Sequence, residues 1–474
     1  MTTSEFYKSL VKSFPFTPTA QQDIALQKLA EFILEDEKEQ VFILKGYAGT
    51  GKTSIVGTLT KNLWKIKMSP VLAAPTGRAA KVMTNYSGYQ SFTIHRKIYY
   101  PKKFGVKINF TLQKNKHKNT VFIVDEASMI SDYNDGGSFS KAGSLLDDLM
   151  EYVYSGRNCK LILIGDTAQL PPVKMELSPA LNEDKISLNY HKDVEHIELT
   201  EVVRQQQESG ILVNATKLRE RIREGFFEDF KFNTQAGNDM MRLVDGDEIM
   251  NAIHEAYDNL GHEETALIVR SNKRANLYNQ QIRARILFRE DEIAAGDFLM
   301  VVKNNYFWIK PSSEAGFIAN GDIIEILEIY EIKELYGFRF ARVKVQMVDY
   351  PKMKAFETII MLDTLDINAP SLPFEDSNKL YEEVMKDYVD ITSKYRKYLK
   401  VKNNPYFNAL QVKFSYAMTC HKSQGGQWNT VFVEQPYIRD GIITKEYLRW
   451  LYTACTRASD KLYLLGFKDD FFEN

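Results

Sequence analysis

The chain has 474 residues, with 61 Lys and Arg against 62 Asp and Glu, which leaves a formal net charge of -1. Its 44% hydrophobic and 26% charged residues are typical of a globular protein and exclude long disordered tails, and the length indicates about three domains. Because the molecule supplies no overall basic field, any surface for nucleic acid must be a local groove.

Cysteines and apolar stretches bear on the compartment. Cys159, Cys420 and Cys455 stand apart in the sequence, without the spacing of a zinc site or of a disulfide framework. Residues 1–14 lack a long apolar core, and no apolar stretch approaches the roughly 18 residues that a membrane span needs. The sequence therefore predicts a cytoplasmic protein that has no membrane partner.

Residues 46–53 read GYAGTGKT, a full match to the phosphate-binding pattern G-x-x-x-x-G-K-[ST]. The segment follows the apolar run VFIL and precedes a helix-like segment, so a strand, a glycine turn and a helix N-terminus would aim backbone N–H groups at phosphates. Lys52 would reach the terminal phosphates, and Thr53 would hold Mg²⁺. The loop predicts a nucleoside triphosphate site made by Gly46, Ala48, Gly49, Thr50, Gly51, Lys52 and Thr53.

Short apolar runs alternate with helical or polar segments, which is typical of parallel strands buried on both faces. The runs VFIL (41–44), VLAA (71–74), VFIV (121–124) and LILIG (161–165) predict a doubly wound α/β domain over residues 1–185. A second series comprises HIELT (196–200), TALIV (265–269), TVFVE (430–434) and KLYLLGF (461–467). It predicts a second α/β domain in two parts, residues 186–297 and 409–474.

Two insertions interrupt these domains. Residues 298–408 contain IIEILEIYEI and FRFARVKVQMV, whose period-two alternation predicts antiparallel strands, followed by a charged helical segment over 375–400. Residues 97–118 carry aromatic and basic residues around a Lys-Phe-Gly turn and predict a β-hairpin.

Polar side chains follow two of the buried strands. VFIVDEASMI (121–130) ends a strand in Asp125 and Glu126, and LILIGDTAQLPPV (161–173) places Asp166 and Gln169 beside the same sheet edge. The first carboxylate suits a Mg²⁺ ion, and the second can take a proton from the attacking water. An amide such as that of Gln169 can sense a γ-phosphate or orient water.

Taken together, GYAGTGKT, APTGRAAKVM (74–83), VDEAS (124–128) and GDTAQLPPV (165–173) resemble the motifs of superfamily 1 helicases. The resemblance is to the RecD-like and Dda-like 5′-to-3′ branch, which is related to the Pif family. It implies an α/β fold of two RecA-like parallel-sheet domains in tandem, with ATP and Mg²⁺ as cofactors. It also implies a hairpin insertion in the first domain and a small SH3-like β-barrel in the second, where FIANGDIIEI (317–326) resembles the opening strand.

The resemblance assigns further residues to the nucleotide site. LTEVVRQ (199–205) and YTACTRASDKL (452–462) resemble family motifs that deliver Arg204 and Arg457 from the second domain to the transition state. In TAQQDIA (19–25), Gln22 would read the adenine edge, with Gln21 as the competing choice. Tyr452 and Thr453 are predicted to be packing and capping residues.

The resemblance also implies a nucleic-acid track that crosses both domains. The candidate strand contacts are Pro75, Thr76, Thr93, His95, Thr419, His421, Lys422 and Ser423. Gln424 and Gly425 fit the loop that couples the strand to the nucleotide. Phe104, at the predicted hairpin tip, would stack on a base and split the duplex, although packing against its own hairpin is an equal rival.

The leading hypothesis is an ATP-driven DNA helicase that moves 5′ to 3′ along a single strand. Its partners would be single-stranded DNA and duplex DNA with a 5′ tail, and the protein is expected to be a monomer that works with replication or repair proteins. The runner-up is a DNA-stimulated ATPase that binds strands or remodels protein–DNA complexes without separating a duplex. A small-molecule P-loop kinase would need neither the two arginine motifs nor HKSQG.

Overall fold

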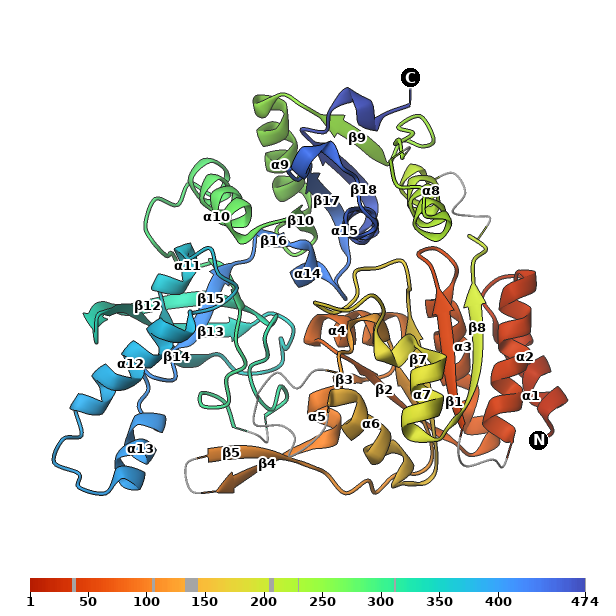
Figure 1. Cartoon of the computed structure of the whole chain (residues 1–474), viewed down its shortest axis with the longest axis horizontal. Helices are drawn as coiled ribbons and strands as arrows, with labels where there is room; N and C mark the ends of the chain where they lie inside the picture. The colour runs from red at the N-terminus through yellow and green to blue at the C-terminus, as the bar shows by residue number, and fades with distance from the viewer. Residues whose placement is uncertain are drawn as a thin grey trace.

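The structure is a computed structural model that describes residues 1–35, 40–104, 107–132, 144–203, 209–228, 230–310 and 313–473. The chain forms two parallel-sheet α/β domains, a closed barrel and a projecting hairpin (Figure 1). These layers confirm the predicted fold class. Within the described ranges, no helix is both long enough and apolar enough to cross a bilayer.

The first sheet has six parallel strands in the order β3-β2-β6-β7-β1-β8. The strands are β1 (Gln40–Gly46), β2 (Ser69–Ala74), β3 (Ser91–Thr93), β6 (Lys118–Val124), β7 (Arg157–Gly165) and β8 (Asp193–Leu199). Side chains alternate between its faces, so Phe42 and Leu44 pack on one side while Val41 and Ile43 pack on the other. Both faces are apolar because helices cover both.

The helices of the first domain divide between these faces. Those on the Phe42 side are α1 (Thr3–Ser13), α2 (Ala20–Leu34), α3 (Lys52–Asn62) and α4 (Gly77–Ser87). Those on the Val41 side are α5 (Ile94–Ile98), α6 (Leu145–Tyr154) and α7 (Glu183–Tyr190). This double cover leaves the C-terminal edge of the strands as the place where loops gather.

One strand belongs to a different sheet from the one predicted. Residues 196–200 were expected to open the second domain, but β8 pairs in parallel with β1, with Leu44 opposite Ile197. The prediction was wrong because alternation along DVEHIEL identifies a strand without identifying its sheet; an edge position leaves its polar side chains in solvent. The first domain therefore extends beyond residue 185 to include Leu199.

The second sheet has five parallel strands in the order β16-β10-β17-β18-β9. They are β9 (Met240–Leu243), β10 (Thr265–Val269), β16 (Ala417–Thr419), β17 (Trp428–Glu434) and β18 (Ala458–Leu465). One face packs against α8 (Gly210–Glu224) and α15 (Lys445–Cys455), and the other against α9 (Gly246–Leu260) and α10 (Asn272–Gln281). Among the described elements, β8 is the last strand of the first sheet and β9 is the first strand of the second.

A closed five-stranded barrel interrupts the second domain. Its strands are β11 (Phe298–Val301), β12 (Ile323–Leu335), β13 (Phe338–Met347), β14 (Phe356–Met361) and β15 (Leu410–Phe414). The predicted opening strand at 317–326 overlaps β12, the second strand, because β11 is too short to show alternation. The predicted end at residue 408 precedes β15, which closes the barrel by pairing with β11.

The last barrel strand leads directly into the second sheet. Only Ser415 and Tyr416 separate β15 from β16, and a single hydrophobic cluster joins barrel side chains such as Val343 to sheet side chains such as Leu267. The charged helical segment predicted near residue 380 forms α12 (Phe374–Lys386) and α13 (Lys394–Lys402), which lie against the barrel.

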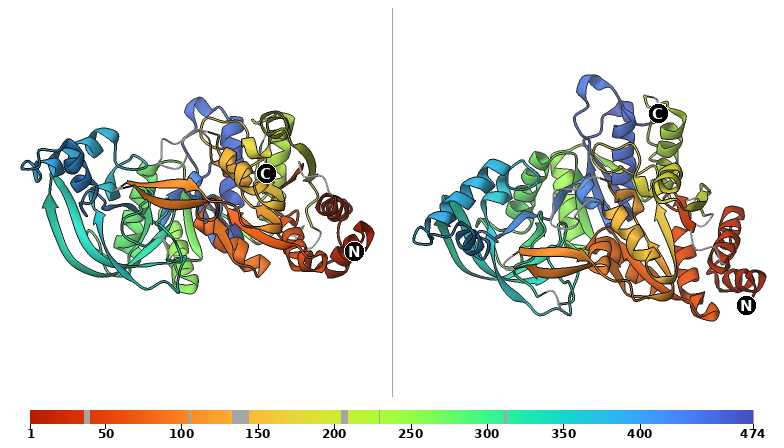
Figure 2. Two further views of the ribbon diagram at one scale, coloured as in Figure 1. Left: turned by 90° about the horizontal axis from the view of Figure 1, so that it is seen from below. Right: turned by 60° about the horizontal axis from the view of Figure 1, so that its bottom comes forward.

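The predicted hairpin is present as β4 (Tyr99–Phe104) and β5 (Lys107–Leu112). Phe104 is the last residue of β4 and pairs with Lys107, so its backbone lies at the end of the hairpin, while its side chain falls outside the described part of the structure. The hairpin projects from the first domain toward the barrel and α13 in all three views (Figures 1 and 2).

Candidate functional site

The phosphate loop has the geometry that its glycines permit. Gly46 ends β1, and α3 begins at Lys52, with Gly49 at φ +74° and Gly51 at φ +85° between them. A Cβ added at Gly46 would lie 2.9 Å from Thr50 Oγ1. Glycine is therefore required for close backbone approach at position 46 and for the left-handed backbone at positions 49 and 51.

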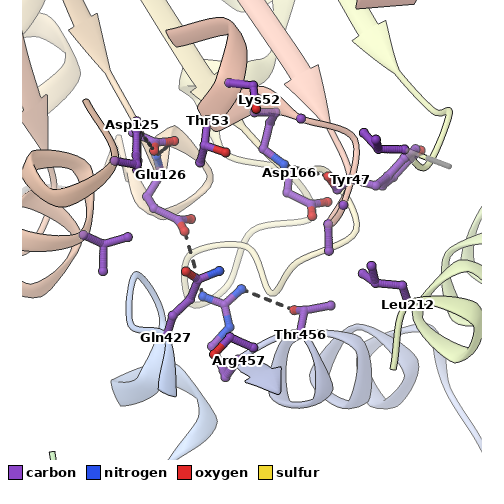
Figure 3. A pocket seen from close by; sticks show the side chains of 18 of the residues that line it. Tyr47, Lys52, Thr53, Asp125, Glu126, Asp166, Leu212, Gln427, Thr456 and Arg457 are labelled. Carbon is purple, nitrogen blue, oxygen red and sulfur yellow. Dashed lines mark hydrogen bonds and ion pairs between the residues drawn. The ribbon is translucent and has the colours of Figure 1, made fainter. Parts of the chain in front are cut away.

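A cavity of about 450 Å³ opens at this loop, between the two α/β domains (Figure 3). The first domain contributes its loop and the C-terminal edge of its sheet, and the second contributes residues around β17, α8 and α15. The predicted site residues that line it are Gln22, Ala48, Gly49, Gly51, Lys52, Thr53, Asp125, Glu126, Gln169 and Arg457. Residues far apart in the sequence thus meet in one cavity.

Lys52 and Asp125 occupy the floor of the cavity. Lys52 Nζ donates hydrogen bonds to the carbonyl oxygens of Gly46, at 2.7 Å, and Tyr47, at 2.8 Å. Asp125 Oδ2 accepts a hydrogen bond from the Tyr86 hydroxyl at 2.8 Å, and Oδ1 accepts one from the Glu126 N–H at 2.8 Å. These bonds orient the Asp125 carboxylate.

Glu126 has an unusual backbone and an unusual environment. Its φ of 53° and ψ of 36° are left-handed, a conformation that costs a non-glycine residue of order 1–3 kcal/mol and is often retained at functional sites. Burial raises the pKa of its carboxyl group, while the positive charge of Arg457 acts in the opposite direction. A raised pKa improves a carboxylate as a proton acceptor near neutral pH.

Arg457 reaches the cavity from the second domain. It is 4% exposed and follows the C-terminus of α15, where Nε donates to the Thr453 carbonyl oxygen at 3.0 Å and Nη1 donates to that of Gly426 at 3.2 Å. Nη1 also lies 3.9 Å from Glu126 Oε1 (Figure 3). Arg457 is thus held in place within its own domain while it faces a carboxylate of the other.

Arg204, the other predicted arginine, lies outside the described residues. The segment before it contacts the phosphate loop, because the Val203 N–H donates to the Gly49 carbonyl oxygen at 3.0 Å.

The two glutamines of TAQQDIA have different environments. Gln22 lines the cavity, where its Nε2 donates to the Thr50 carbonyl oxygen at 2.9 Å and its Oε1 accepts from the Thr19 N–H at 3.0 Å. Gln21 instead binds the backbone N–H groups of Thr200, at 2.6 Å, and Glu201, at 3.1 Å. The geometry favours Gln22 for adenine recognition, which remains a prediction.

The cavity fits a triphosphate carried with Mg²⁺. The amide oxygen of Gln169 is buried without a hydrogen-bond partner in the described part of the chain, and its residue lines the same cavity. Thr53 and Asp125 supply the hydroxyl and carboxylate oxygens that Mg²⁺ takes alongside nucleotide phosphates. Lys52 would hold the phosphates, and Mg²⁺ would neutralise charge that develops on them.

The predicted strand contacts of the first domain lie at helix starts. Thr76 caps α4 through a hydrogen bond from the Ala79 N–H at 3.2 Å, and Thr93 caps α5 through one from the Arg96 N–H at 3.2 Å. Burial lowers the pKa of His95 to about 4, so its ring is neutral at physiological pH. Pro75 and Thr76 are partly exposed, whereas Thr93 is buried.

The predicted strand contacts of the second domain surround α14 (Cys420–Ser423). Lys422 Nζ donates to the Asn320 side chain of the barrel, and burial lowers the pKa of Lys422 to about 8. His421 is exposed and Thr419 is half-buried. Ser423 is fully buried and donates to the Cys420 carbonyl oxygen at 2.8 Å, because a four-residue helix turns this hydroxyl inward; its strand contact stays a prediction.

The predicted coupling loop touches both domains. Gly425, at φ +73°, approaches α4 so closely that an added Cβ would lie 2.8 Å from Ala79 Cβ and 3.1 Å from Thr76 Oγ1. After this loop, Trp428 begins β17, and its ring is covered by the guanidinium of Arg78 in α4 at 3.9 Å. The loop at Gly425 is therefore a neighbour of Thr76, one of the candidate strand contacts of the first domain.

Tyr452 and Thr453 do more than pack and cap. The Tyr452 hydroxyl donates to Asp166 Oδ2 at 2.6 Å, and the Thr453 hydroxyl accepts from the Leu170 N–H at 2.8 Å. Both bonds cross between the domains. These bonds were not predicted, because an aromatic residue in a helix ordinarily indicates packing. The nearby Arg457 motif was the signal that this end of the helix reaches the site.

The fold and the cavity define a P-loop nucleotide-binding protein with two tandem RecA-like domains. Comparison with known proteins is more specific. Residues 19–238 match the family model of an AAA domain, and residues 414–465 match that of a UvrD-like helicase C-terminal domain.

Two of the following three relatives carry helicase names. ATP-dependent DNA helicase dda of Enterobacteria phage T4 is 28% identical over 62% of this chain and 64% of its own length. ATP-dependent RecD2 DNA helicase of Deinococcus radiodurans is 29% identical over 43% of this chain and 27% of its own length. Uncharacterized protein R530 of Acanthamoeba polyphaga mimivirus is 23% identical over 93% of this chain and 98% of its own length. The chain thus spans less than two thirds of the two named helicases.

Among solved structures, Pif1 helicase from Bacteroides, in complex with ADP-AlF3 and ssDNA, aligns with a TM-score of 0.45 and 14% identity, covering 97% of this chain and 95% of that one. Pif1 helicase from Candida albicans aligns with a TM-score of 0.40 and 16% identity over 96% of each chain. The family models and the named sequence relatives agree with the resemblance predicted from the motifs: the chain is similar to superfamily 1 helicases of the RecD-like and Dda-like type.

We expect Arg457→Ala to lower the ATPase turnover number by about 10³-fold or more, the effect of removing an arginine that stabilises transition-state charge. Binding of single-stranded DNA should remain within threefold of wild type, because Arg457 faces the nucleotide cavity. Steady-state ATPase and fluorescence anisotropy measure the two effects. Arg223→Ala, at an exposed site on α8, is the matched control, and normal turnover in Arg457→Ala would contradict the assignment.

Proposed function

We propose that the protein is an ATP-dependent DNA helicase that moves 5′ to 3′ along single-stranded DNA and separates duplex DNA. One observation carries the proposal: the phosphate loop and carboxylates of one RecA-like domain share a cavity with a buried arginine of the other. A cavity completed by two domains links its chemistry to their relative position.

In the proposed hydrolysis step, Glu126 accepts a proton from the attacking water while Lys52 and Arg457 stabilise charge on the transferred phosphoryl group. Gln169 orients the water or senses the γ-phosphate. Asp125 and Thr53 would hold Mg²⁺. Each of these groups lines the cavity, and Glu126 and Arg457 already face each other across it.

Movement along a strand follows from closure of the cavity. Nucleotide binding would draw the domains together and hydrolysis would release them, so that grip alternates between the Thr76 region and the Lys422 region. The contact of Gly425 with Thr76 and Ala79 places these regions at the same domain boundary as the cavity. Polarity is inferred from the motif resemblance and the named relatives rather than from geometry.

The direction is tested with duplexes that carry either a 5′ or a 3′ single-stranded tail. We expect ATP-dependent strand separation only from the 5′-tailed duplex, and none by Lys52→Ala, which lacks the phosphate-binding amine. Separation only from the 3′ tail would overturn the polarity. DNA-stimulated ATPase activity with no separation of either duplex would instead favour a strand-binding or remodelling ATPase.

The hairpin role is tested separately. Phe104→Ala should slow unwinding of the 5′-tailed duplex by about fivefold or more, because loss of one base–aromatic contact is worth ~1–3 kcal/mol. ATPase activity on single-stranded DNA should stay unchanged. Tyr100→Ala, at an exposed aromatic residue in the same strand, serves as the control, and unchanged unwinding by Phe104→Ala would remove Phe104 from the mechanism.

A further inference from the structure

The Tyr452 hydroxyl is a buried junction between the two domains. It belongs to α15 of the second domain and has no solvent exposure. It donates a hydrogen bond to Asp166 Oδ2 at 2.6 Å and accepts one from the backbone N–H of Ala48 at 2.9 Å. One hydroxyl of the second domain thereby joins the phosphate loop to the turn after β7.

That turn is also held by its backbone. The Leu170 N–H donates to the Thr453 hydroxyl at 2.8 Å, and the Leu170 carbonyl oxygen accepts from Gln424 Nε2 at 2.7 Å. Leu170 is 2% exposed and packs in the hydrophobic cluster of the second domain, although it belongs to the first. The turn that contains Gln169 is thus fixed by side chains from two separate motifs of the second domain.

We propose that Tyr452 is a positioning residue that fixes the position of Arg457 relative to the phosphate loop. Through this contact, binding of nucleotide in the cavity would change the affinity of the strand-binding surface. The proposal rests on the proposed ATPase function. Tyr452 and Arg457 lie at the same end of α15, so a bond from Tyr452 to the loop fixes where Arg457 stands relative to the phosphates. Asp166 is oriented from its other side by the Ala168 N–H at 2.9 Å, so Tyr452 supplies the interdomain part of that orientation.

Tyr452→Phe keeps the ring and removes only the hydroxyl. A buried hydrogen bond to a charged group contributes ~1.5–3 kcal/mol, so we expect the turnover number for ATP to fall by about 10- to 100-fold with KM within threefold of wild type. We also expect the ratio of single-stranded DNA affinities with and without a non-hydrolysable ATP analogue to fall toward one, while the affinity without nucleotide is retained. A purely structural role would lower the unfolding temperature without changing this ratio.

Tyr447→Phe is the matched control. Tyr447 lies on the same helix, and its buried hydroxyl has no hydrogen-bond partner within the described residues, so its removal should change neither the turnover number nor the ratio. If Tyr452→Phe does not fold, Asp166→Asn removes the acceptor charge and should show the same fall in the ratio.

The outcomes separate the two hypotheses. If Tyr452→Phe keeps the wild-type turnover number and affinity ratio, or if Tyr447→Phe loses them equally, the positioning role of Tyr452 is overturned. Neither result would contradict the proposed ATPase function. A wild-type protein whose ATPase does not respond to single-stranded DNA, or an active Lys52→Ala, would instead overturn the proposed function.

A second surface stands out by its charge. Helix α13 contains five cationic residues and no Asp or Glu in nine positions: Lys394, Arg396, Lys397, Lys400 and Lys402. Lys394, Arg396 and Lys400 are exposed and form no ion pair within the described part of the chain. The neighbouring helix α12 has four acidic residues and two lysines, so its net charge has the opposite sign. In a chain of net charge -1, such a cationic face is a local feature.

The position of α13 identifies its partner. In Figures 1 and 2 it lies beside the free end of the β4–β5 hairpin, where the proposed function divides the duplex. We infer that the exposed face of α13 binds the phosphate backbone of duplex DNA ahead of the hairpin. Lysine and arginine contacts of this kind give affinity without sequence preference.

The test is equilibrium binding of a forked DNA at several salt concentrations. Changing Lys394, Arg396 and Lys400 together to Gln should reduce the slope of log K against log salt by about 2–3, because each phosphate contact with duplex DNA contributes about 0.9. Binding of a single strand should not change. The matched control replaces three exposed lysines on α1 and α3, at the far end of the molecule: Lys8, Lys12 and Lys61.

An unchanged slope for the forked DNA, or an equal reduction in the control, would overturn the duplex-binding role of α13. The assay contains no nucleotide, so its result is independent of ATPase activity and of unwinding. The result would therefore distinguish a failure of duplex binding by α13 from a failure of the proposed helicase activity.

Discussion

The contact between the two α/β domains includes hydrogen bonds between buried polar groups. An unpaired polar group in such a place costs ~1–3 kcal/mol, and more when it is charged, so each partner constrains the other to a narrow geometry. Asp166, Tyr452 and Arg457 all lie in this boundary and all are nearly or fully buried. The cavity therefore adjoins a set of directional, buried interdomain bonds, so a small change in domain position would alter the positions of the groups that line it.

Local sequence accounts for much of the first domain's contribution. A strand followed by a glycine turn and a helix places Gly46, Lys52 and Thr53 without reference to the rest of the chain, and carboxylates after buried parallel strands must gather at one sheet edge. These features were predictable because they depend on short segments. The hairpin was predictable for the same reason, since its two strands are adjacent.

Other features depend on contacts that the sequence does not display. The pattern of DVEHIEL fits an edge strand of either sheet, and only pairing with β1 decides between them. The resemblance proposed Ser423 as a strand contact without indicating that the turn of α14 directs its hydroxyl inward. The hydroxyl of Tyr452 forms hydrogen bonds with Ala48 and Asp166, which lie about 400 and 290 residues away in the chain, so no local pattern indicates its role.

The continuity of β15 with β16 has a mechanical consequence. Because two residues and a shared hydrophobic cluster join the barrel to the second sheet, the barrel cannot pivot freely on that domain. The barrel and the second sheet are therefore joined as one packed unit. Any change in the position of the second domain would carry with it the barrel and α13, which packs against the barrel.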